Sequence, residues 1–292
     1  MFRTERKGYT PRMNDPTPYL DVNAVLHDFL TRVRTVLGER FRGMYLSGSL
    51  ALGGFSPHSS DIDFVVVTDA DLPDDRFLAL QAMHARFNAD GSPWATEVEA
   101  AYIPQDALRR YDPARARHPH MERGADEILK MDQLGSDWIV QRFILREHGV
   151  VIAGPDPRTL IDPISPEDLR RSVVTLMHTW WGPMRHDTSR LELHDIGYQP
   201  YAVLTMCRIL YTLDSGAVVS KPLAARWAQE ALDGRWVGLI ERALAWRKDR
   251  RNAAPGDDVK ETLDLIRYTL QRCQQLRLPP SPTGMQGSTD NP

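Results

Sequence analysis

The sequence predicts an α+β protein in which an N-terminal domain with a mixed sheet is followed by an all-helical bundle domain. Three observations predict this class. At 292 residues, the chain is at the upper end of what one hydrophobic core serves. Short apolar runs typical of buried strands alternate with helical patterns in its first part, whereas apolar residues from Ala125 onward recur mainly at helical spacing. A proline-rich link, 154–166, separates the two parts.

These features predict four segments. We expect a flexible arm over residues 1–16, a mixed-sheet domain over 17–156, a helical domain over 157–278 and a disordered tail over 279–292.

The mixed-sheet domain is predicted from five consecutive patterns. Residues 20–37 carry apolar side chains at helical spacing, and the pattern ends near Gly38. The apolar run 43–46 is expected to be a buried strand that breaks at Ser47-Gly48-Ser49. Further strands are predicted over 62–67 and 96–103, on either side of a helix over 77–87. The basic, proline-containing run 104–123 is predicted to be a long loop.

The helical domain is predicted from repeated amphipathic patterns. The run Ser165-Pro166-Glu167-Asp168 places a proline and two acids where a helix begins. Together with a last helix of the first domain, the predicted helices are 137–148, 166–181, 199–213, 222–232, 236–250 and 257–276.

Composition limits the classes of function. With 42% hydrophobic and 26% charged residues the chain is typical of globular proteins, and its net charge of −3 gives no basic footprint for nucleic acid. No apolar run reaches the roughly 18 residues of a membrane span, and the start has no signal-peptide pattern. We therefore expect a cytoplasmic protein without membrane or nucleic-acid partners.

The segment from Gly48 to Asp63 carries the most informative chemistry. Glycine lets the backbone approach a phosphate closely, and Ser49 offers a hydroxyl and an amide to phosphate oxygens. Twelve residues after Ser49, Asp61 and Asp63 stand two apart on an expected strand and so project on one face. Paired carboxylates suit Mg²⁺, a hard cation that prefers oxygen ligands.

A third carboxylate on the neighbouring strand would complete such a site. Glu97 and Glu99 are both candidates, because they also stand two apart on the strand predicted over 96–103. His118 and His120 flank a proline in the predicted loop, and an isolated His-x-His is a weak indication of a metal site.

The runs Tyr45-Leu46-Ser47-Gly48-Ser49 and Ser60-Asp61-Ile62-Asp63-Phe64 resemble the nucleotidyltransferase superfamily related to DNA polymerase β. Further runs narrow the resemblance to the aminoglycoside 3''/9 adenylyltransferases, which modify streptomycin and spectinomycin. These are Arg146-Glu147-His148-Gly149, the stretch 204–211 and Ser220-Lys221. The likeness extends from about residue 20 to 276, which makes the first domain polymerase β-like.

The resemblance implies an enzyme that uses Mg²⁺ to move AMP from ATP to a hydroxyl of a small cationic aminoglycoside or aminocyclitol, with a monomer as the expected active form. It implies that Asp61 and Asp63 hold two Mg²⁺ ions and that Glu97 is both a metal neighbour and the general base, with Glu99 as the rival. Its implied contacts to the nucleotide are Ser47, Gly48, Ser49, Arg208 and Lys221 with the phosphates, and Trp246 with the adenine.

The expected acceptor side departs from the streptomycin-modifying members. Those enzymes use a tryptophan in the connection before the helical domain and an acid just ahead of the arginine helix. This chain has no tryptophan between Trp94 and Trp138, and Tyr198 stands where the acid would be. The stretch before Tyr198 is acidic and includes Asp187, which would suit a cationic ring. We therefore expect spectinomycin to be favoured over streptomycin.

Two other functions fit the motif. One is a nucleotidyltransferase that modifies a protein or RNA, as in toxin–antitoxin systems, although the fused helical half and the lack of a basic face argue against it. The other is a nucleotide-binding sensor, although three acids beside a polyanion exceed what a pure binder needs.

Overall fold

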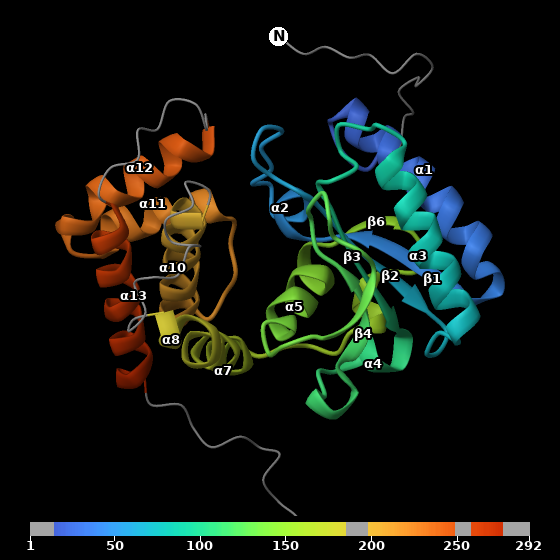
Figure 1. The fold of residues 1–292 in the computed structure, drawn as a ribbon. Coiled ribbons are helices and arrows are strands. Elements are labelled where there is room, and N and C mark those ends of the chain that lie inside the picture. The colour runs from blue at the N-terminus through green and yellow to red at the C-terminus, as the bar shows by residue number, and fades with distance from the viewer. Residues whose placement is uncertain (1–14, 185–197, 249–257, 277–292) are drawn as a thin grey trace, which may run out of the picture.

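The computed structural model describes residues 15–184, 198–248 and 258–276, and it consists of a sheet part and a helical part side by side (Figure 1). The sheet has the order β5-β4-β3-β2-β1-β6. Its strands are β1 (Phe41–Leu46), β2 (Ile62–Thr68), β3 (Val98–Pro104), β4 (Arg117–Met121), β5 (Lys130–Gln133) and β6 (Val150–Ala153). Only β2 and β3 pair in parallel, so the sheet is mixed and the expected α+β class is confirmed.

Helices cover both faces of the sheet because side chains alternate along each strand. Met44 and Leu46 face the cluster under α1 (Leu20–Leu37) and α3 (Asp74–Ala89), whereas Tyr45 between them faces the opposite cluster. That second face is covered by α4 (Gln105–Arg109), α5 (Trp138–His148) and α6 (Pro157–Leu160). Short 3₁₀ turns are formed by Gly38–Arg40, Pro113–Arg115 and Gly234–Trp236.

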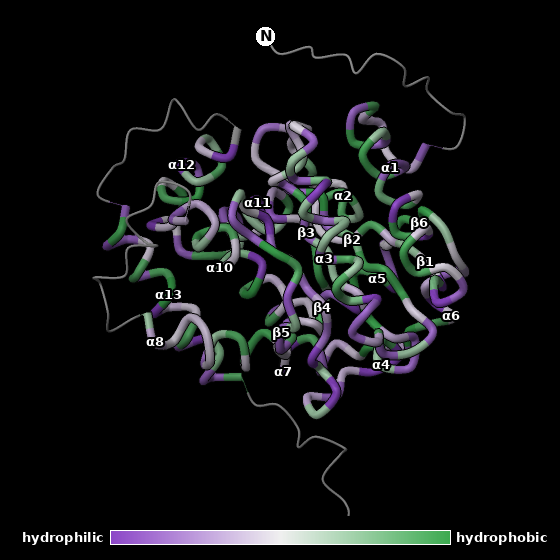
Figure 2. Tube along the Cα trace, turned by 45° about the vertical axis from the view of Figure 1, so that its right-hand side comes forward, coloured by the Kyte–Doolittle hydropathy of each residue, from purple (hydrophilic) through white to green (hydrophobic). Residues whose placement is uncertain are grey.

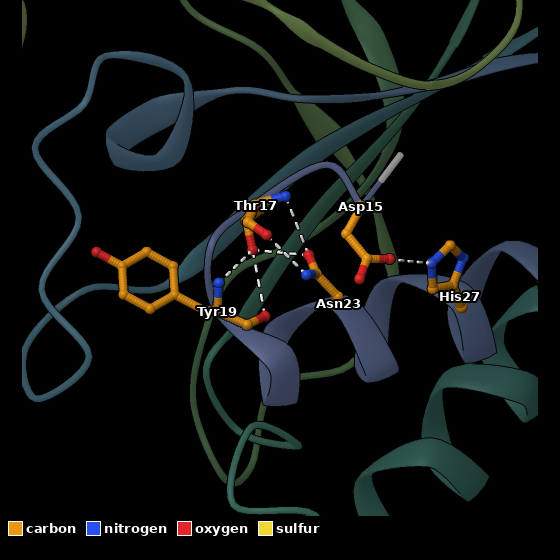
Figure 3. Close-up of polar contacts among 5 residues, drawn as sticks. All are labelled: Asp15, Thr17, Tyr19, Asn23 and His27. Carbon is orange, nitrogen blue, oxygen red and sulfur yellow. Dashed lines mark hydrogen bonds and ion pairs between the residues drawn. The ribbon is translucent and has the colours of Figure 1, made fainter. Parts of the chain in front are cut away.

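The start of α1 is held by a polar network (Figure 3). The buried Asn23 side chain accepts hydrogen bonds from Thr17 N (3.1 Å) and Thr17 Oγ1 (2.7 Å), and it donates one to Thr17 O (2.7 Å). One turn further along, His27 Nε2 lies 3.3 Å from Asp15 Oδ1. These contacts tie the segment before the helix, at Asp15 and Thr17, to the first two turns of α1.

The helical part packs around α10 (Tyr198–Ser215), which contacts α7 (Pro166–Leu176), α11 (Lys221–Ala231), α12 (Val237–Lys248) and α13 (Asp258–Gln275). The predicted start of α7 is a capping box between Ser165 and Asp168. Hydrophobic segments gather inside each part of the chain (Figure 2). Val140 and Ile144 of α5 join the helical core, so α5 connects the two parts.

The structure contains β5, β6 and α6, which the sequence did not predict, and it differs from the predicted elements in three further places. The run 104–123 contains α4, a 3₁₀ turn and β4 instead of a long loop. The helix expected over 166–181 changes at Met177 into a π-helical segment, Met177–Trp181, followed by α8 (Gly182–Met184). The turn after β1 is itself the short helix α2 (Gly48–Ala51).

The predicted arm and tail lie largely outside the described residues: of the arm only 15 and 16 are described, and of the tail none. Within the described parts of the chain, no helix is both long enough and apolar enough to cross a membrane.

Candidate active site

The turn between β1 and α2 lies directly against the Asp63 carboxylate. Ser47 N donates a 2.9 Å hydrogen bond to Asp63 O, and the backbone N–H of Ser49 donates to the Asp63 side chain. Gly48 has φ +54°, and a Cβ placed there would lie 1.9 Å from Asp63 Oδ2. A glycine is therefore required at this position both for its backbone conformation and for the close approach.

Two hydroxyls of this turn are oriented differently. Ser47 Oγ donates to Gln141 Oε1 of α5 at 3.2 Å, which ties the turn to α5. Ser49 Oγ is buried and has no hydrogen-bond partner. Because buried polar atoms are nearly always paired, an unpaired hydroxyl at this place indicates a site that a polar ligand completes.

Three carboxylates meet at the ends of the parallel strand pair. Asp63 lies opposite Glu99 in the β2–β3 register, and carboxylate oxygens of Asp61, Asp63 and Glu99 lie within 4.8 Å of one another. Glu97 lies one residue before β3 and is not part of this set. The geometry therefore favours Glu99, the rival candidate, over Glu97 for the third metal-ligand position.

Glu97 still lies at the edge of the site. Arg123 Nη1 is 3.8 Å from Glu97 Oε2 and 3.6 Å from Asp61 Oδ2, so one guanidinium pairs with both carboxylates. Both acids are partly exposed, with side-chain exposures of 37% and 26%. Glu97 is therefore partly exposed at the rim of the cluster, and Asp63 is half-buried.

Burial and like charge both act on Asp63. Desolvation raises the pKa of Asp63 well above its ordinary value, and the negative charges of Asp61 and Glu99 raise it further. Lys221 and the Ser49 N–H lower the pKa of the same group. Such a set of carboxylates stays ionised most easily when a cation sits among them.

Two cations of the helical part face this cluster from α10 and α11. Desolvation lowers the pKa of Lys221 to about 7, and the nearby charges of Arg208 and Arg247 lower it as well. Burial also lowers the pKa of Arg208, whereas the nearby Tyr201 and Asp63 raise it. Lys221 Nζ lies 4.3 Å from the Tyr201 ring centroid. Crowded, desolvated cations beside carboxylates are typical of a site for a polyanion.

A third cation, Arg247 on α12, joins the two parts and was not predicted from the sequence. Its Nη2 donates to Gly54 O at 2.7 Å and to Ser60 Oγ at 3.0 Å. The adjacent Trp246 is 9% exposed. In the sequence, Arg247 was noticeable only as the neighbour of Trp246, the predicted adenine contact. That position does not indicate a contact with Gly54, 193 residues earlier.

The expected acceptor side is only partly described. Tyr198 begins α10 and lies in an aromatic group with Trp181 (ring centroids 6.0 Å apart) and Tyr201 (5.5 Å). Tyr201 extends from this group to Lys221, which connects Tyr198 to the charged centre. Asp187 lies outside the described residues.

Comparisons with known proteins agree with this geometry. A nucleotidyltransferase domain model matches residues 30–110, and the model of the aminoglycoside adenylyltransferase C-terminal domain matches residues 159–272. The sheet, its acidic cluster and the first match define a nucleotidyltransferase.

Curated relatives match over most of their length. The aminoglycoside (3'') (9) adenylyltransferase of Escherichia coli is 26% identical over 264 residues, covering 84% of this chain and 95% of that protein. The spectinomycin 9-adenylyltransferase of Campylobacter jejuni is 21% identical over 259 residues, covering 86% and 95%. The crystal structure of spectinomycin adenyltransferase AAD(9) from Enterococcus faecialis with ATP and spectinomycin superposes with a TM-score of 0.66 at 19% identity, covering 86% of this chain and 99% of that one.

The chain belongs to the aminoglycoside 3''/9 adenylyltransferase family, and it is an adenylyltransferase enzyme. The family predicted from the sequence is confirmed.

Proposed function

We propose that the enzyme transfers AMP from ATP to a hydroxyl of an aminocyclitol antibiotic, and that it favours spectinomycin over streptomycin. The observation that carries the transfer is the group of Asp61, Asp63 and Glu99 opposite Arg208 and Lys221. Carboxylates on one side and cations on the other match a triphosphate with its metal ions.

The residues of the cluster fit Mg²⁺. Asp61, Asp63 and Glu99 supply oxygen ligands within 4.8 Å of one another, and their mutual repulsion is relieved by a divalent cation. Bound Mg²⁺ would neutralise charge on the triphosphate. Two ions are proposed, as in the sequence prediction.

The nucleotide is proposed to lie between the turn at α2 and the helical part. The unpartnered Ser49 hydroxyl and the backbone of Ser47 and Gly48 supply phosphate contacts from one side. Arg208 and Lys221 supply positive charge from the other. Trp246 beside Arg247 is proposed to pack on the adenine.

In the chemical step, Glu97 is proposed as the general base. Its partly exposed carboxylate takes the proton of the acceptor hydroxyl, whose oxygen then forms a bond to the α-phosphorus of ATP. The bond from that phosphorus to the β-phosphate oxygen breaks, and pyrophosphate leaves.

The acceptor preference rests on the residues that differ from streptomycin-modifying enzymes. Tyr198 places an aromatic ring where an acid was expected, and the connection 95–137 contains no tryptophan. Relatives named for spectinomycin 9-adenylyl transfer are among the matches, beside relatives named for both the 3'' and the 9 position, so the preference rests on the residues of this chain. Asp187 is retained as a proposed acceptor contact.

Mass spectrometry of antibiotics after incubation with enzyme, ATP and Mg²⁺ tests the proposal. We expect spectinomycin to gain the mass of one AMP group, with a higher kcat/KM than streptomycin. Asp63→Asn is the control for chemistry, since it should abolish transfer. The absence of any adduct across a broad antibiotic panel would refute the proposed acceptor class, and a higher kcat/KM for streptomycin would refute the preference.

A further inference from the structure

We propose that His120, Glu122 and Asp132 bind a divalent transition-metal ion such as Zn²⁺, at a site distinct from the Asp61/Asp63/Glu99 cluster. One ligand atom from each of the three residues lies within 4.8 Å of the other two. His120 belongs to β4 and Asp132 to the adjacent β5, while Glu122 follows β4 directly. In the antiparallel register Asp132 lies directly opposite His118 and diagonally across from His120, so all three side chains lie on one face of the strand pair.

The Nδ1 atom of His120 points toward Asp132 without a hydrogen-bond partner. His120 is 7% exposed, so more than nine-tenths of it is buried, and its Nδ1 atom makes no hydrogen bond. The distance from Nδ1 to Asp132 Oδ2 is 3.6 Å, which is too long for a hydrogen bond. Two ligands that share a tetrahedral zinc ion lie about 3.4 Å apart when each bond is about 2.1 Å long. The pair is spaced as two ligands of one metal ion.

The opposite ring nitrogen of His120 faces a carboxylate at ion-pair distance, which is longer than a hydrogen bond. His120 Nε2 lies 3.7 Å from Glu99 Oε1. Histidines that bind metals usually direct their second nitrogen to a carboxylate or carbonyl, which fixes the ring orientation. The ring of Trp138 meets His120 edge-on with centroids 6.2 Å apart and restricts it further. Glu99 belongs to the Asp61/Asp63/Glu99 cluster and lies on the Nε2 side of the His120 ring, so it is not a ligand of the proposed site.

The type and accessibility of the ligands indicate which metal would bind. An imidazole with two carboxylates suits zinc or another first-row divalent ion, whereas Mg²⁺ prefers oxygen alone. Glu122 is exposed and the Asp132 side chain is 38% exposed, so an ion can enter from solvent.

Zinc titration of the full chain by calorimetry tests the site. The titration uses ZnCl₂ alone, on the Asp61→Asn/Asp63→Asn double variant, which removes ligands from the other cluster. We expect one zinc equivalent, and an affinity loss of at least about ten-fold on His120→Gln. Co²⁺ bound at the same place should give visible absorption that the His120 variant lacks.

His118→Gln is the matched control. His118 is on the same strand, is also buried and also has a ring nitrogen without a hydrogen-bond partner, yet it is outside the cluster. Its variant should retain zinc affinity. Asp132→Asn is the second variant, and it decides the question if His120→Gln does not fold as judged by circular dichroism without metal.

Failure to bind zinc would overturn the proposal and leave His120 as a member of an ion-pair network with its surrounding acids. Equal weakening by His118→Gln and His120→Gln would also overturn it. Neither measurement uses ATP or an antibiotic, so the result is independent of the proposed transfer reaction.

Discussion

Replacing Gly48 with alanine should abolish adenylyl transfer while leaving the protein folded. The new Cβ would lie 1.9 Å from Asp63 Oδ2 and 2.4 Å from Asp63 Cγ. Since non-bonded contacts below about 3 Å are repulsive, the carboxylate must retreat by about 1 Å. A displacement of this size at a reacting centre costs about 100-fold in rate.

The same substitution also strains the backbone, and this effect can be separated. Gly48 has φ +54°, and alanine in the left-handed region costs about 1–2 kcal/mol. Gly53 has φ +66° and open space around its missing Cβ. Gly53→Ala therefore has the unfavourable backbone conformation but no steric clash. It should be destabilised by a similar amount and keep its activity.

The assay is kcat/KM for AMP transfer, together with thermal unfolding of both variants. We expect similar melting temperatures for the two variants and an activity at least about 100-fold lower for Gly48→Ala. Equal activity of the two variants would refute the reasoning, because it would mean that the position of Asp63 does not limit catalysis.

Further predictions concern two glutamates and two cations of the site. Glu97→Gln should lower kcat by about 100- to 10,000-fold without changing the Mg²⁺ requirement, as expected for a lost base. Glu99→Gln should instead raise the Mg²⁺ concentration needed for half-maximal rate. ATP affinity, measured by calorimetry, should fall as pH rises through about 7. Lys221 is then deprotonated and no longer offers a positive charge to the phosphates. Lys221→Met should weaken binding and remove this pH dependence. Arg247→Met should raise KM for ATP about ten-fold, which corresponds to about 1.4 kcal/mol, because it removes the two hydrogen bonds that hold α12 against Gly54 and Ser60.

Each of these predictions has an opposing result. A kcat loss in Glu99→Gln that excess Mg²⁺ does not restore, with an active Glu97→Gln, would exchange the two roles. An unchanged pH profile in Lys221→Met would assign the titration to another group. A wild-type KM in Arg247→Met would show that its contacts with Gly54 and Ser60 are not needed for nucleotide binding.

The long, strongly periodic elements were predictable because their pattern is local. The helix over 20–37 coincides with α1, and the strand over 62–67 with all but the last residue of β2. Strand β4 was not predictable, because Arg117, Pro119 and the two histidines have the composition of a loop. It is a strand because β3 and β5 supply partners on its two sides.

Pairing across the sheet also gives the two glutamates different positions. Glu97 and Glu99 share one face of an alternating pattern, so the sequence left both open as metal ligands. The parallel register places Glu99 directly opposite Asp63, and β3 begins only after Glu97. Strand register depends on contacts between distant segments and has no local signature.

The sequence by itself determined the fold class, the family and the aspartate pair, because each depends on residues close together in the chain. The tertiary structure decided what distant segments do together. It placed Lys221 and Arg208 opposite Asp63, brought Arg247 to Gly54 and turned His120 toward Asp132. Charges and unpaired atoms acquire their chemistry from such neighbours, and only folding brings those neighbours together.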